Sequence, residues 1–274
     1  MVRKSTPHAH MDLVDGHSTA REMIASAKAK GFYSLGFSEH ARQKFDHRYG
    51  MSVESESFYK DIIGRLSRET DDLIVVLGLE LDEFGVCDTE DYSYIIGSKH
   101  YMANSDLTDF FAVDGDYETI CKGCGRFFGG DWLKLGKTYF GQLADYICRV
   151  KPEIVGHFDL VSKLNEKNGM FDANDAGYLK AGFEALERIA AVNPLLEINT
   201  GAMARGYTTR PYPAIPFLKR WKELGGEIIL STDCHDAEKI DYALDDANRL
   251  ALAAGYESAF CLSSRDGRFE GYKL

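Results

Sequence analysis

Short apolar runs alternate with amphipathic segments along the chain, and this alternation predicts strands and helices in turn. The expected strands lie near 32–40, 73–80, 92–100, 153–159, 195–200 and 227–235. The expected helices cover about 18–31, 54–68, 132–150, 173–191, 213–224 and 240–254. Strands that alternate with helices are typical of βα units around a parallel sheet.

The chain has 274 residues, of which 45% are hydrophobic, so one well-buried core can account for its whole length. No internal repeat, low-complexity segment or linker interrupts it. We therefore expect a single domain over residues 1–274, with seven or eight strands. The least regular stretch, about 102–131, contains several glycines and is expected to be a long loop near the active site that could act as a lid.

Metal-binding residue types stand where the predicted strands end. Six of the eight histidines follow this pattern, together with one glutamate and one aspartate, and a seventh histidine, His17, and a second aspartate, Asp15, lie in the loop after the first of these strand ends. The strand-end residues are His8, His10, His40, Glu80, His100, His157, Asp233 and His235. Because the carboxyl ends of barrel strands open onto one face, these side chains are expected to converge there.

The residue types suit a cluster of metal ions. Imidazole binds Zn, Fe and Mn, and a carboxylate can bridge two ions, a role for which Glu80 is the natural candidate. Residues two apart on a strand point to the same side, so His8 and His10 can bind one ion together, and Asp233 and His235 can do the same. Each pair alone is a weak signal, whereas the ordered set is a strong one.

Two other features are expected to be structural. His47 matches no strand end and is interpreted as a solvated loop residue. The pair Cys121 and Cys124 has the spacing of half a zinc knuckle, but the chain has no second pair of that spacing. The six cysteines show no compact disulfide spacing, which favours reduced thiols in a cytoplasmic protein.

The charge balance argues against a nucleic-acid partner. The formal net charge is −11, and the 32 basic residues are scattered rather than clustered along a groove. The longest apolar run, 73–79, is too short to span a bilayer, and the N-terminal segment lacks the apolar centre of a leader peptide. We expect a soluble cytoplasmic protein that does not bind membranes, and the sequence leaves its oligomeric state open.

The motifs resemble those of the PHP superfamily, named for polymerases and histidinol phosphatases, and most closely its stand-alone histidinol-phosphate phosphatases. The resemblance covers nearly the whole chain. It rests on His8-Ala-His10, Asp15-Gly16, Ser38-Glu-His40, Gly78-Leu-Glu80, Gly97-Ser-Lys-His100, Gly156-His157-Phe-Asp-Leu, Glu197-Ile-Asn199-Thr and Ser231-Thr-Asp233-Cys-His235. It implies an α/β fold of the distorted (β/α)7 barrel type.

The resemblance also implies a site for three divalent ions, Zn, Mn or Fe, whose identity the sequence leaves open. The implied ligands are His8, His10, Glu80 and Asp233 for one ion, Glu80, His100 and His157 for a second, and Asp15, His40 and His235 for a third. Met11 replaces the threonine common after the first motif, and Asp15 and His17 both lie in the loop that would supply the last ligand. Spacing favours Asp15.

The implied reaction is hydrolysis of L-histidinol phosphate to L-histidinol and inorganic phosphate, in histidine biosynthesis. A hydroxide bridging two ions would attack phosphorus, with Glu80, Asp233 and His235 at the reaction centre. Lys163 and Arg205 follow two strand ends in loops that carry phosphate-binding basic residues in the resembling phosphatases. We expect both to contact the substrate's phosphate. The proton donor to the leaving group stays unassigned.

Two other functions remain open from the sequence. One is a PHP phosphoesterase for another small phosphate ester, such as a nucleotide or a sugar phosphate. The other is a metal-binding or polymerase-accessory module without catalytic activity. The intact ligand set argues against the second, because such modules are expected to lose ligands.

Overall fold

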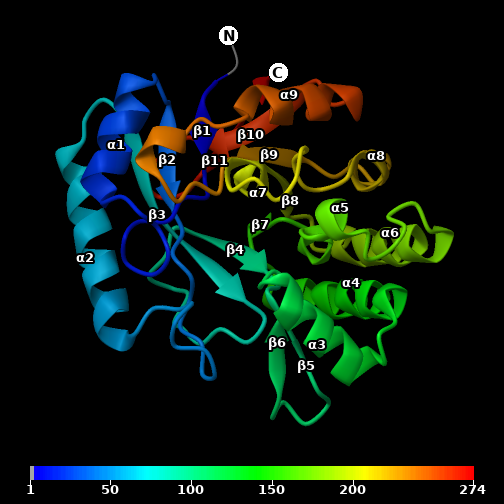
Figure 1. Cartoon of the computed structure of the whole chain (residues 1–274). Coiled ribbons are helices and arrows are strands. Elements are labelled where there is room, and N and C mark those ends of the chain that lie inside the picture. The colour runs from blue at the N-terminus through cyan, green and yellow to red at the C-terminus, as the bar shows by residue number, and fades with distance from the viewer. Residues whose placement is uncertain (1–2) are drawn as a thin grey trace.

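The computed structural model describes residues 3–274 as a sheet surrounded by helices (Figure 1). The main sheet has the order β1 (Ser5–Thr6), β2 (Ser34–Phe37), β3 (Ile74–Asp82), β4 (Tyr94–Ser98), β7 (Ile154–Val155), β8 (Leu195–Asn199), β9 (Ile228–Ser231), β10 (Ser258–Leu262) and β11 (Phe269–Lys273). Neighbouring strands from β1 to β10 are parallel, and β11 pairs antiparallel with β10. Spatial order follows chain order, as the predicted βα alternation requires.

The helices link successive strands. They are α1 (Ala20–Ala29), α2 (Val53–Glu69), α3 (Tyr117–Phe128), α4 (Trp132–Val150), α5 (Asn165–Asn168), α6 (Ala176–Ala190), α7 (Gly201–Ala204), α8 (Ile215–Glu223) and α9 (Leu244–Ala253), with short 3₁₀ turns at Leu160–Ser162 (η1) and Ala237–Lys239 (η2). Thr19 caps α1 with a reciprocal bond to Glu22, which confirms the predicted start of this helix. The apolar stripe of α1, Met23, Ile24 and Ala27, is buried as its periodicity predicts.

The two faces of the sheet bury separate sets of apolar side chains. Val75 belongs to the large core beneath the helices, whereas its neighbour Val76 belongs to a smaller cluster on the other face, as strand alternation requires. Tyr94 fills this second face. A Cβ at Gly78 would lie 2.2 Å from Cζ of Tyr94, so only glycine leaves room for the ring.

The expectation of a long loop at 102–131 is wrong, because most of this stretch forms strands and a helix. It contains the hairpin β5 (Tyr101–Ala103) and β6 (Phe110–Ala112), followed by α3. Asp116 caps α3 by accepting a hydrogen bond from Thr119, and a Cβ at Gly123 would lie 2.3 Å from the ring of Phe111. Gly123, one of the glycines that indicated a loop, therefore lies where α3 packs closely against the hairpin. The C-terminal strands β10 and β11 were also missed.

The structure shows a mixed α/β fold with a mostly parallel sheet. Strands β1 and β9 are not neighbours in the sheet order, but the residues just beyond them meet. Ala9 and Cys234 form a parallel bridge, in which His10 N donates to Cys234 O at 2.8 Å. This bridge brings both ends of the predicted ligand series together. Among residues 3–274, no helix is long and apolar enough to cross a membrane.

Candidate metal centre

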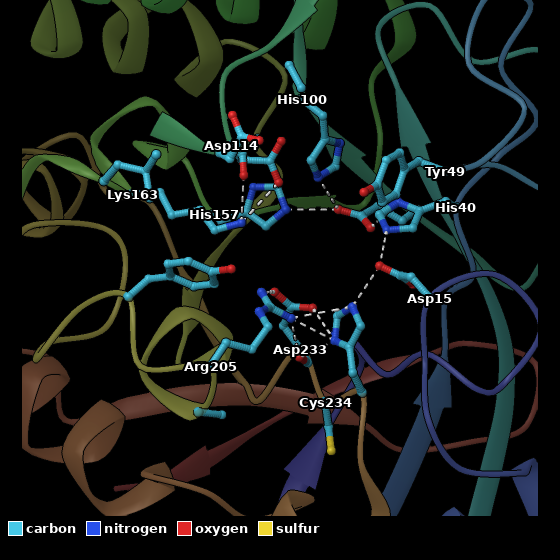
Figure 2. A pocket seen from close by; sticks show the side chains of 18 of the residues that line it. Asp15, His40, Tyr49, His100, Asp114, His157, Lys163, Arg205, Asp233 and Cys234 are labelled. Carbon is cyan, nitrogen blue, oxygen red and sulfur yellow. Dashed lines mark hydrogen bonds and ion pairs between the residues drawn. The ribbon is translucent and has the colours of Figure 1, made fainter. Parts of the chain in front are cut away.

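One pocket of about 780 Å³ opens where the parallel strands end (Figure 2). Seven of the predicted ligands line it: Asp15, His40, Glu80, His100, His157, Asp233 and His235. His8 and His10 lie completely buried next to these residues. The tertiary structure thus gathers all nine predicted ligands, from segments that span most of the chain, into one cluster.

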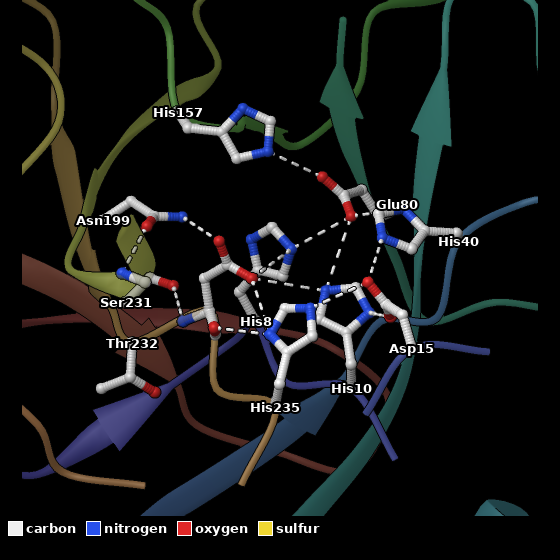
Figure 3. A network of polar contacts seen from close by, with 12 residues as sticks. His8, His10, Asp15, His40, Glu80, His157, Asn199, Ser231, Thr232 and His235 are labelled. Carbon is white, nitrogen blue, oxygen red and sulfur yellow. Dashed lines mark hydrogen bonds and ion pairs between the residues drawn. The ribbon is translucent and has the colours of Figure 1, made fainter. Parts of the chain in front are cut away.

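Glu80 lies at the centre of this cluster (Figure 3). Five imidazoles have a ring nitrogen within 3.5 Å of its carboxylate oxygens: His157 (2.9 Å), His40 (2.9 Å), His8 (3.3 Å), His100 (3.4 Å) and His10 (3.5 Å). Burial alone would raise the pKa of Glu80, but the surrounding imidazoles, His40 and His8 foremost, hold it well below the ordinary value. The carboxylate is therefore ionised, which is the form that binding a metal ion would require.

Three overlapping groups of side chains have the spacing to hold a metal ion. They are His10, Asp15, His40 and His235; His8, His10 and Asp233; and His40, Glu80 and His100. Asp15 belongs to the first group through Oδ2, which lies 3.1 Å from Nε2 of His235. His17 also lines the pocket but is exposed and belongs to none of the three groups.

The residues fit divalent metal ions. Several of their polar atoms are buried without a hydrogen-bond partner in the described part of the chain: His8 Nε2, both ring nitrogens of His10, Asp15 Oδ1, Glu80 Oε2 and His157 Nδ1. Each such atom costs about 1–3 kcal/mol unless another group satisfies it. Burial and the neighbouring His235 and His40 lower the pKa of His10 to about 3, so its ring is neutral, the form that binds metal.

Comparison with known proteins fixes the family. A model of the PHP domain matches residues 7–201, which is most of the chain. The chain belongs to the PHP domain family. This confirms the resemblance that the strand-end motifs indicated.

Similar proteins carry histidinol-phosphatase names. The chain is 24% identical over 267 residues to a Schizosaccharomyces pombe protein named "Probable histidinol-phosphatase", with 88% of this chain and 82% of that protein covered. A crystal structure of histidinol phosphate phosphatase from Lactococcus lactis, complexed with Zn, L-histidinol and phosphate, has a TM-score of 0.73 at 22% identity. That comparison covers 98% of this chain and 99% of the other, so the two proteins share their fold.

Two carboxylates outside the predicted ligand set orient imidazoles in this PHP domain. Glu197, fully buried in the middle of β8, lies 2.7 Å from Nδ1 of His8 and accepts a 2.7 Å hydrogen bond from the main chain of His157. Oδ2 of Asp82 lies 3.3 Å from Nδ1 of His100 and also accepts a 2.7 Å hydrogen bond from the main chain of the same residue. Such partners fix ring orientation. Glu197 stands in one of the motifs, so the sequence signal was present, but its contact with His8 was not foreseen.

Both predicted phosphate-binding cations of the PHP domain line the pocket (Figure 2). Arg205 donates from Nη2 to Oδ2 of Asp233 at 3.0 Å. Lys163 donates from Nζ to Asp114 and is largely buried. Gly201 leaves room for the first of these contacts, because a Cβ there would lie 2.5 Å from Oδ2 of Asp233.

The remaining polar residues that the sequence singled out lie outside the cluster. His47 is exposed and does not line the pocket. Cys121 and Cys124 are free thiols on α3, and neither belongs to any of the three metal-binding groups found among residues 3–274. These positions agree with the structural interpretation of both.

Proposed function

We propose that this protein is a metal-dependent phosphomonoesterase that hydrolyses L-histidinol phosphate to L-histidinol and inorganic phosphate, in histidine biosynthesis. The observation that carries the proposal is the placement of Glu80 among five imidazoles in a pocket that Arg205 and Lys163 also line. The names of the similar proteins support the choice of substrate. The pocket volume accommodates a small phosphate ester.

The candidate ligands divide among three divalent ions, for which Zn, Mn and Fe are suitable. We assign His8, His10, Glu80 and Asp233 to one ion, Glu80, His100 and His157 to a second, and Asp15, His40 and His235 to a third. Support comes from the three overlapping groups, which share His10 and His40, and from the contacts of Glu80 with imidazoles of every set. When bound, closely spaced divalent ions activate water at neutral pH and neutralise the charge of phosphoryl oxygens.

The side chains of this protein then have separable roles. Glu80, Asp233 and His235 belong at the reaction centre, where their contacts hold neighbouring ligands in a fixed arrangement. The guanidinium of Arg205 lies against Asp233 and faces the pocket, so it can donate to a phosphoryl oxygen there. Lys163 also lines the pocket and supplies a second positive charge. Both cations help to bind and orient the phosphate before the leaving-group bond breaks.

Phosphate release from L-histidinol phosphate tests the proposal. Purified protein loaded with Mn or Zn is compared with a chelated control, and with nucleotide and sugar phosphates as competing substrates. A chelator-sensitive preference for L-histidinol phosphate is the expected result. Preference for another ester would refute the proposed substrate but support metal-dependent phosphate-ester hydrolysis. Inactivity with metal bound would favour an accessory metal-binding module.

We further infer that the sheet closes as a distorted (β/α)7-type barrel, with β10 and β11 as an addition. The bridge between Ala9 and Cys234 and the hydrogen bond from Thr232 N to Oγ1 of Thr6 support this closure. A cytoplasmic location is also inferred. All six cysteines are free thiols, which agrees with a reducing compartment.

A further inference from the structure

A largely buried ion pair lies in the pocket wall beside the candidate metal ligands. Nζ of Lys163 donates to the main-chain oxygen of Asp114 at 3.0 Å and to Oδ2 of its carboxylate at 3.2 Å. Both residues line the pocket, and the side chain of Asp114, 26% exposed, is more accessible than that of Lys163, 9% exposed. Figure 2 shows both residues on the side of the pocket that carries His157.

Hydrogen bonds of the residues before and after Asp114 in the sequence fix its position. The preceding residue, Val113, donates a 2.8 Å hydrogen bond to the main-chain oxygen of His100, which ties the end of β6 to a candidate ligand. Two residues further on, Asp116 caps α3. The ring of Tyr207 also contacts Lys163, with its centroid 4.6 Å from Nζ. The pair is therefore a defined feature of the pocket.

Asp114 is a carboxylate with an available negative charge. Burial would raise its pKa, but Lys163 and the imidazole of His100 hold the pKa below the ordinary value. If Lys163 turns toward a phosphate dianion, the carboxylate of Asp114 loses part of the positive charge that balances its own charge in a largely buried site. An uncompensated buried charge is costly, so the complex is favoured when the substrate itself supplies a cation.

We propose that Asp114 is a specificity residue that binds the ammonium group of phosphate esters whose alcohol carries an amine close to the ester oxygen. The proposal rests on the phosphatase function proposed above. A substrate of this kind carries a negative and a positive end separated by a short carbon bridge, and the Lys163–Asp114 pair presents the opposite charges side by side. Esters without the amine leave Asp114 unmatched and bind less favourably.

A simpler role for Asp114 would be to hold Lys163 in place. The two roles differ in one measurable respect. A residue that only positions Lys163 affects every phosphate ester alike, because the phosphate is common to all of them. A residue that binds the ammonium group affects the ratio of kcat/KM between esters with and without the amine.

The test compares two matched substrate pairs with the metal-loaded enzyme. One pair is L-histidinol phosphate and its analogue without the amine, and the other is phosphoethanolamine and ethyl phosphate. We expect the wild-type enzyme to prefer the amine-bearing member of each pair by about ten- to a hundred-fold, the worth of a charge-assisted hydrogen bond. In Asp114→Asn this preference is expected to fall to within about three-fold of unity.

Asp116→Asn is the matched control. It removes one negative charge from the lining of the same pocket, and asparagine caps helices as well as aspartate does, so α3 stays intact. The amine preference is expected to persist in this variant. Loss of the preference in Asp116→Asn with retention in Asp114→Asn would overturn the assignment.

Two further outcomes would also overturn the proposal. One is a wild-type enzyme with no amine preference, a result that depends on no variant folding. The other is an equal decline for both members of each pair in Asp114→Asn. Weak activity on L-histidinol phosphate with a clear preference for phosphoethanolamine over ethyl phosphate would instead refute the proposed substrate and support the role of Asp114.

Discussion

Oε1 of Glu197 lies 2.7 Å from Nδ1 of His8, and both side chains are completely buried. This contact turns the other ring nitrogen, Nε2, toward Glu80 at 3.3 Å and Asp233 at 3.8 Å. The second oxygen of Glu197 accepts from the main chain of His157. One carboxylate on β8 therefore orients candidate ligands that follow β1 and β7.

Replacing Glu197 with Gln keeps the volume but removes the charge that favours this orientation of His8. We expect metal affinity to fall by about 10–100-fold, the usual cost of losing such a partner. Equilibration against metal buffers followed by elemental analysis measures the change. Glu153→Gln is the control, because Glu153 also accepts a main-chain hydrogen bond, from Ile95, but lies at the start of β7, away from the pocket. Equal affinities in the two variants would contradict the role of Glu197.

Asp15 and His17 offer a matched pair of substitutions within one loop. Asp15 lies 3.1 Å from His235 and 3.6 Å from His40, whereas His17 is exposed. We expect Asp15→Ala to lose about one bound ion per chain and to lower kcat by about a hundred-fold or more. His17→Ala should change neither by more than about two-fold. Metal content per chain and steady-state kinetics distinguish the two residues. Loss of metal and activity in His17→Ala but not in Asp15→Ala would assign the ligand role to His17.

Arg205→Ala is expected to lower kcat/KM for the phosphate ester by about 10–100-fold, mainly by raising KM. The physical reason is the loss of a guanidinium that faces the pocket beside Asp233. Arg205→Lys should recover part of the loss, since it keeps the charge without the planar fork. Metal content is measured in parallel and should change little. Unchanged kinetics in the alanine variant would remove the phosphate contact from Arg205.

Metal removal should destabilise the folded protein. Without ions, Nε2 of His8, both ring nitrogens of His10 and Oε2 of Glu80 form no hydrogen bond with any other group among residues 3–274. Saturating Mn or Zn at about 100 times its Kd contributes about 2.7 kcal/mol per site, which corresponds to roughly 5 °C or more in Tm. Thermal unfolding followed by circular dichroism, with and without chelator, measures the shift. Identical melting curves would contradict a metal centre built from these residues.

Much of the fold could be read from local patterns. The strand after Gly31, the strand that contains Glu80, the start of α1 and the long helix after Asp131 all appear close to where local patterns predict them. The errors fall where tertiary contacts decide. Gly123 was expected in a loop, but it lies in α3, where a glycine is needed because the ring of Phe111 packs against its backbone. Such a contact has no local sequence signal.

Local patterns specify which candidate ligand types occur and in what order, because most of them stand near a strand end and parallel strands end on one side of a sheet. The contacts between these ligands arise only when the chain folds. The tertiary structure placed the carboxylate of Asp15 beside the ring of His235, and it paired His8 with Glu197, 189 residues away. It also set Asp114 against Lys163. These pairings depend on how strands far apart in the chain are aligned, and sequence spacing carries no record of that alignment.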